Sequence, residues 1–102
     1  MIKINIIKKN KRVYEIAIVG HANYDEYGKD IVCAAVSTMA ITTINNIIAL
    51  EQTIDYEEKS GSLRIRVTKD TAINEKILNN FIRMLQELKS QYPQNIEIRN
   101  ED

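Results

Sequence analysis

The chain opens with two short segments in which apolar and polar residues alternate. Residues 2–6 place isoleucine at every second position, and residues 13–18 repeat the alternation with tyrosine and isoleucine. A period of two residues is typical of strands with one buried face. The polar residues 9–11 lie between the two segments. The pattern therefore predicts a β-hairpin that ends at Gly20.

The next apolar segment has a different pattern and predicts a long helix that ends near Leu50. Its apolar residues cover more than one stripe of a helix over residues 31–50. A helix that is apolar on several faces is buried on several faces. We expect this helix to pack against a sheet on one side and against a helix or a partner subunit on the other. Residues 21–29 are polar and predict a loop, and Asp30 is expected to be the helix N-cap.

The second half repeats the order of the first. Residues 53–59 and 63–67 predict two further strands, joined by a turn at residues 60–61. Asp70 or Thr71 is expected to cap a second helix.

An amphipathic stripe marks this second helix. Its apolar positions recur at helical spacing, and Pro93 is expected to end it. The positions are Ile73, Ile77, Phe81, Leu85 and Leu88. Residues 96–98 predict a short last strand. The resulting order, β-β-α-β-β-α-β, predicts an α+β fold with an antiparallel sheet and two helices packed on one face.

Composition narrows the function classes. The 102 residues predict one domain, residues 1–102, and the 14 Lys and Arg balance the 14 Asp and Glu. A net charge of zero removes the usual argument for nucleic-acid or membrane binding, and it leaves homo-oligomers favoured. No run of apolar residues approaches the length of about 18 that a membrane span needs. We expect no membrane and no nucleic acid as partners.

The cysteine content indicates the compartment. A single cysteine cannot form an internal disulfide, which favours the cytoplasm. The spacing of His, Cys and carboxylates predicts neither a metal site nor a cofactor.

His21 and Cys33, the chain's only histidine and cysteine, form the candidate catalytic pair. The attacking species is a thiolate, and a helix N-terminus or a nearby imidazolium raises the thiolate fraction. With Cys33 in the first helical turn, unsatisfied N–H groups could also bind an oxyanion. His21 would act first as a base and then as an acid toward the leaving amine.

Two further side chains are candidates for the same site. Asp30 could orient His21, although the N-cap role competes for its oxygens. Ser37 lies four residues beyond Cys33 on the same helix face, where it could line the site or bond back to a carbonyl. Taken alone, a cysteine in an apolar helix is more often a small core residue, and a histidine after a strand is more often a surface residue.

The motif as a whole resembles the signature of the ribosomal-processing cysteine protease family, Prp. The matching residues are Gly20-His21-Ala22, Gly28 and the run from Asp30 to Ser37. The resemblance implies that Cys33 is the nucleophile and that His21 is the catalytic histidine. It also implies a mobile flap over the substrate cleft, formed by Ala22, Asn23, Tyr24, Asp25, Glu26, Tyr27, Gly28 and Lys29.

The resemblance further implies a small α+β homodimer. Its substrate would be the N-terminal extension, apolar and ending in an aromatic residue, of a large-subunit ribosomal protein, the twenty-seventh in the usual count. The function expected is therefore a cysteine endopeptidase that supports ribosome assembly. The alternative is a ribosome-associated binding module without catalysis.

Overall fold

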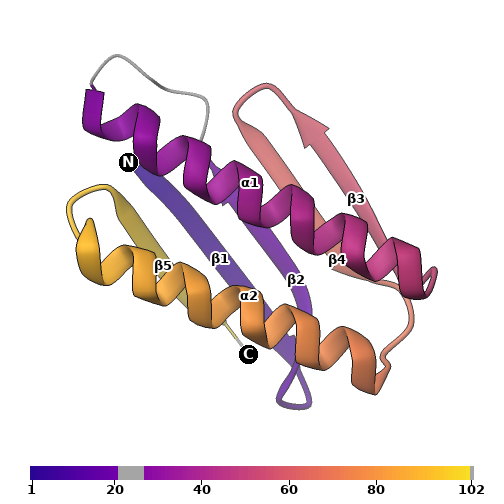
Figure 1. The fold of residues 1–102 in the computed structure, drawn as a ribbon. Coiled ribbons are helices and arrows are strands. Elements are labelled where there is room, and N and C mark those ends of the chain that lie inside the picture. Colours follow the sequence, from indigo (N-terminus) through magenta and orange to yellow (C-terminus); the bar gives the residue numbers. More distant parts are fainter. Residues whose placement is uncertain (21–26, 102) are drawn as a thin grey trace.

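A computed structural model describes residues 1–20 and 27–101, with residues 27–30 described by their backbone (Figure 1). The predicted order of elements is confirmed. The elements are β1 (Ile2–Lys9), β2 (Arg12–Val19), α1 (Tyr27–Leu50), β3 (Ile54–Lys59), β4 (Ser62–Val67), α2 (Ala72–Gln91) and β5 (Ile96–Glu101).

The five strands form one sheet in the order β3-β4-β2-β1-β5. Neighbouring strands are antiparallel except β1 and β5, which pair in parallel with Ile4 opposite Ile98. The sheet is therefore mixed, which corrects the expectation of an antiparallel sheet. The reason is the long helical connection through α2, because a strand–helix–strand crossover returns the chain to the end of the sheet from which it started.

Both helices cover the same face of the sheet, as predicted (Figure 1). Every second residue of β1 from Ile2 to Ile6 is buried between the sheet and the two helices. In β2 the buried residues are Val13, Ile16 and Ile18, because a shift in register interrupts the alternation. The largest fully buried side chains are Ile4, Ile6, Ile16, Ile18, Ile47, Ile65, Leu78, Leu85 and Ile96. Each contributes about 1.5–3 kcal/mol of hydrophobic stabilisation. This layer holds α1 rigidly across the sheet.

Residues 31–50 of α1 contain no charged side chain and have a mean hydropathy of 1.7. By length and composition the segment is long and apolar enough to cross a membrane, which corrects the expectation that no run approaches a span. Serine, threonine and asparagine interrupt the apolar residues without adding charge. In the fold, Val32, Val36, Ala40 and Ile47 are fully buried against the sheet. The inner face of α1 therefore belongs to the core.

The second helix follows its predicted pattern except at its start. Thr71 is the N-cap and accepts the backbone N–H of Asn74 at 3.1 Å, whereas Asp70 binds Arg12. Phe81 and Leu85 are buried as predicted, but Ile73 is 41% exposed. The first turn of α2 turns Asn74 toward the core instead of Ile73. The polar atoms of an asparagine in an apolar layer need hydrogen bonds, and Asn74 forms them with Thr53 and Lys69.

Candidate active site

The residue between β2 and His21 is Gly20, and no other residue type fits at this position. Gly20 adopts φ +91°, and its N–H donates to the Gly61 carbonyl at 2.8 Å. A Cβ at this position would lie 2.7 Å from the carbonyl oxygen of Met1. Positive φ and close approach to another backbone both require the missing side chain. Gly20 thus fixes the direction in which the chain leaves β2 toward the candidate site.

We expect Gly20→Ala to lower the free energy of unfolding by about 2–3 kcal/mol, because backbone strain and the contact with Met1 add together. Gly61→Ala is the matched control. Its φ of +77° gives the same kind of strain, but the described residues offer no close contact to its Cβ. The control should cost about 1 kcal/mol. Urea unfolding of both variants measures the difference, and equal losses would contradict the role of the Met1 contact.

His21 and residues 22–26, which include most of the predicted flap, lie outside the described residues. The pairing of His21 with Cys33 therefore stays a prediction. The remaining predicted flap residues, Tyr27, Gly28 and Lys29, belong to α1. Their assignment to a loop is wrong.

The early start of α1 has a physical explanation. Gly28 and Asp30 favoured a loop followed by a cap, but a glycine in a helix costs only about 1 kcal/mol relative to alanine. The packing of the rest of α1 offsets such a cost. Asp30 is consequently the fourth residue of α1 and not its N-cap, which corrects that prediction. An aspartate in the first turn still favours the positive end of the helix dipole.

The same shift moves Cys33 away from the helix end. Cys33 is the seventh residue of α1 and lies in its second turn, not in the first. The N–H groups without a helical acceptor belong to the first four residues, and the dipole effect fades within the first turn. In this conformation the N–H of Cys33 is part of the regular helix. The N–H group of Cys33 is therefore not available to form an oxyanion hole in this conformation.

The burial of Cys33 also indicates that its thiol is inaccessible in this conformation. Cys33 is 3% exposed and belongs to the core cluster with Val32 and Val36. Ser37 follows one turn later and is half-buried. The described conformation therefore keeps the thiol from bulk solvent. Among residues 1–20 and 27–101, no three His, Cys, Asp or Glu side chains gather in a way that could hold a metal ion.

Sequence reasoning missed the backbone contacts that position the strand end. The Gly20 N–H bond to Gly61 ties the end of β2 to the β3–β4 turn, and Met1 lies against the same glycine. The only signal in the sequence was glycine itself, at positions 20 and 61. Its partners are far away along the chain and could not be read from any local pattern.

Comparison with known proteins links this geometry to one family. The family model for the cysteine protease Prp matches residues 1–97. The ribosomal processing cysteine protease Prp of Staphylococcus aureus (strain Mu50 / ATCC 700699) is 34% identical over 104 residues, covering 96% of this chain and 97% of its own length. The Bacillus subtilis (strain 168) protein of the same name is 34% identical over 55 residues, covering 51% of this chain and 49% of its own.

Two solved structures are similar to this chain over almost its whole length. The essential ribosomal processing protease Prp from S. aureus in complex with a substrate peptide has a TM-score of 0.93 at 28% identity, covering 99% of this chain and 100% of that one. The S. aureus protease with a covalently linked product peptide has a TM-score of 0.86 at 30% identity, with the same coverage. The second complex shows that the S. aureus protein forms a covalent bond to its peptide.

Proposed function

From the premise that this chain belongs to the cysteine protease Prp family, we propose that it removes the short N-terminal extension of a large-subunit ribosomal protein, the twenty-seventh in the usual count. The chain is a cysteine-type endopeptidase by family. The observation that carries the proposed substrate is the likeness, over nearly the full length, to ribosomal processing proteases that bind a substrate peptide and a product peptide.

The proposed reaction uses Cys33 and His21 in two steps. His21 takes the thiol proton while Sγ of Cys33 attacks the scissile carbonyl carbon, and the C–N bond then breaks as His21 protonates the leaving amine. The result is a thioester between Cys33 and the extension. His21 next takes a proton from water, the hydroxide attacks the thioester carbonyl, and the thiol is restored. Asp30 is the residue that we propose to orient His21, since the N-cap position of α1 precedes it.

Catalysis needs a rearrangement near the start of α1. A thiol that is 3% exposed does not meet a peptide, and N–H groups inside a regular helix do not bind an oxyanion. We place this change in the turn that begins at Tyr27, because Gly28 costs that turn about 1 kcal/mol relative to alanine. Unwinding it would move the helix N-terminus closer to Cys33 and free N–H groups for the developing negative charge.

The test is incubation with the ribosomal protein that carries its own extension, followed by mass spectrometry of the intact products. Wild type should release one peptide and leave one mature protein, with the two masses adding to the substrate plus one water. A purely binding module would hold the ribosomal protein and leave its mass unchanged. Absence of cleavage at equimolar enzyme would refute the proposed function.

We also propose that the protein acts as a homodimer through the outer face of α1. Ile31, Ile41 and Ile48 on this face are 40–45% exposed, and residues 31–50 include no charged residue. Interface cores are depleted in charge, whereas the outward faces of helices in monomers normally carry it. A second copy placed by a two-fold axis would cover the same residues on both chains.

A cytoplasmic location fits a thiol enzyme that needs reduced Cys33.

We expect wild type to sediment at twice the chain mass of 11.8 kDa at micromolar concentration. Ile41→Lys should give a monomer, because two lysines would be buried in each symmetric interface. Ile73→Lys is the matched control: Ile73 is equally exposed, at 41%, but lies on α2. The control should remain dimeric. A monomeric wild type, or a dimeric Ile41→Lys variant, would contradict this interface.

A further inference from the structure

The β1–β2 hairpin concentrates positive charge in a chain whose net charge is zero. Residues 1–14 contain four lysines and one arginine but no Asp or Glu. Four of these five cations occupy residues 8–12, at the tip of the hairpin. A neutral total therefore hides a strongly uneven distribution, and the distribution decides what a surface attracts.

The hairpin is fixed against the start of α2 by a set of ionic hydrogen bonds. Arg12 Nε donates to Asp70 Oδ2 at 2.6 Å, and Arg12 also lies 3.7 Å from Glu75 Oε2. The Val13 N–H donates to Glu75 Oε1 at 3.1 Å. The hydrogen bond with Asp70 raises the pKa of Arg12 above its ordinary value. Both carboxylates are thus engaged by Arg12 and the hairpin backbone.

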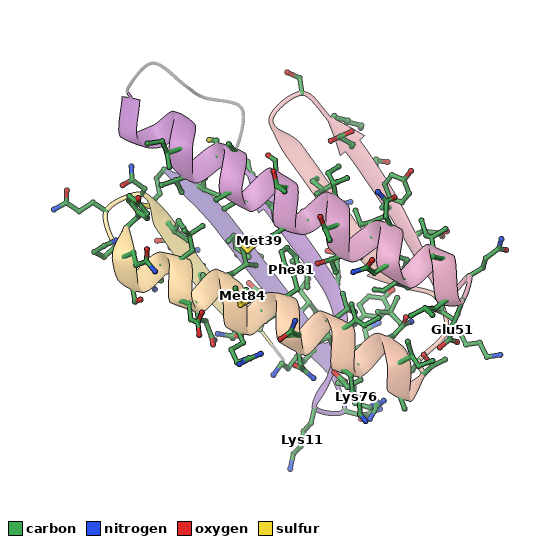
Figure 2. All side chains as sticks on the ribbon, in the orientation of Figure 1. Lys11, Met39, Glu51, Lys76, Phe81 and Met84 are labelled. Atoms are coloured by element: carbon green, nitrogen blue, oxygen red, sulfur yellow. The ribbon has the colours of Figure 1, made fainter. Side chains whose placement is uncertain are left out.

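Five lysines surround this contact, and we call them the basic end: Lys8, Lys9, Lys11, Lys69 and Lys76. All except the half-buried Lys8 are exposed. Figure 2 shows Lys11 extending from the hairpin tip and Lys76 on the neighbouring part of α2, at the same end of the molecule. Lys9 Nζ lies 3.8 Å from the centre of the Tyr14 ring, which holds it beside a hollow of about 280 Å³ between the hairpin and residues 67–70.

The turn itself carries a lysine where the backbone favours glycine. Asn10 and Lys11 have φ values of +53° and +66°. Two-residue hairpin turns with two positive φ values prefer Asn-Gly, because a side chain at the second position is strained. The chain keeps a charged side chain at this strained position and presents it at the tip. Strain that persists at an exposed position motivates a functional hypothesis.

We propose that the basic end binds the phosphate backbone of RNA. Lysines from β1, the hairpin turn, the segment before α2 and α2 itself, all near one end of the molecule, suit a chain of phosphates. Phosphates pair with such point charges without base recognition. The choice of RNA among polyanions rests on the proposed function, since the substrate there is a ribosomal component. The proposal departs from the expectation, drawn from net charge, that nucleic acid is not a partner.

The position of the basic end leaves the candidate active site open. The hairpin tip and Gly20 lie at opposite ends of β2, and the eight residues of this strand span about 26 Å. RNA at the tip would therefore not cover Cys33. A peptide of about eight extended residues could reach from RNA bound there to the thiol. The two activities can consequently be measured apart.

The test is fluorescence anisotropy of a labelled RNA stem-loop of about 20 nucleotides at about 50 mM salt. Lys11→Gln/Lys76→Gln should bind about 10-fold more weakly than wild type and reduce the slope of log K against log salt by about two. The matched control is Lys59→Gln/Lys89→Gln, which removes the same charge away from the basic end and should change binding less than twofold. Equal weakening in both variants, or tighter binding to anionic phosphatidylglycerol vesicles than to RNA, would overturn the proposal.

A single substitution separates charge from structure. Lys11→Gly relieves the positive φ and should raise the melting temperature by about 4 °C, while it weakens RNA binding about threefold. A raised melting temperature with unchanged RNA binding would mean that Lys11 does not contact RNA, which would overturn the proposal. Cleavage of a short extension peptide should be the same in all these variants. Loss of RNA binding with intact cleavage thus separates failure of this inference from failure of the proposed function.

Discussion

Cys33→Ala is expected to lower the rate of extension cleavage by about 10⁴-fold or more, because it removes the atom that attacks the carbonyl. The measurement is single-turnover cleavage of the ribosomal protein, followed by mass spectrometry. Ser37→Ala is the comparison. It removes a side-chain heteroatom one turn further along α1, and it should change the rate less than tenfold. A wild-type rate from Cys33→Ala would contradict the assignment of the nucleophile.

The same variant should stay folded. Cys33 belongs to the buried cluster under α1, and loss of one sulfur atom from a core costs about 1 kcal/mol. Cys33→Ser is the less clean variant, because it places a hydroxyl among apolar side chains while remaining a poor nucleophile. Thermal melts of both variants should therefore rank Ala above Ser in stability, with both inactive.

The fold could be predicted where periodicity is strong. Alternation in β1 and β2 and the 3.6-residue period of α2 each determined an element, because a strand or helix with one buried face must repeat at that spacing. The orientation of β5 could not be predicted from residues 96–98, since nothing local says whether a strand runs with or against its neighbour. The burial of Asn74 in place of Ile73 was equally hidden, because it depends on partners from other segments.

The candidate active site also combines features that the sequence predicts with features that depend on tertiary contacts. The identity of Cys33 came from the ordered motif, which no tertiary contact alters. The start of α1 was misplaced by a turn, since Gly28 and Asp30 have local preferences that packing of the remaining helix overrides. The burial of Cys33 depends on which residues cover it, and that is a tertiary property. Gly20 drew attention as a turn residue, but its contact with Met1 required the structure.

The second large effect is a loss of folding stability, and we expect it at Asn74, far from the candidate active site. Asn74 is 1% exposed and forms the centre of a polar cluster at the junction of α1, β3 and α2. Its Nδ2 donates to the carbonyls of Thr53 and Lys69 at 3.2 and 3.0 Å, and its Oδ1 accepts the Thr53 hydroxyl at 2.6 Å. One side chain thus forms hydrogen bonds with both the segment after α1 and the segment before α2.

We expect Asn74→Leu to lower the free energy of unfolding by about 3–4 kcal/mol. The substitution keeps a similar volume but leaves the buried hydroxyl of Thr53 and the part-buried carbonyl of Lys69 without this partner. Each orphaned group costs about 1–3 kcal/mol. Asn79→Leu is the control on the same helix. Asn79 donates to Glu75 at an exposed position, so its loss should cost less than about 0.5 kcal/mol.

Urea unfolding at equal protein concentration measures both variants, and similar losses would show that the buried cluster carries no special stability. The active site offers an independent check. Cys33 precedes the end of α1 at Leu50 by 17 residues, about 26 Å along the helix axis. The folded fraction of Asn74→Leu should therefore cleave at nearly the wild-type rate. A large drop in that rate would mean that the junction positions α1, and with it the thiol, from the far end of the helix.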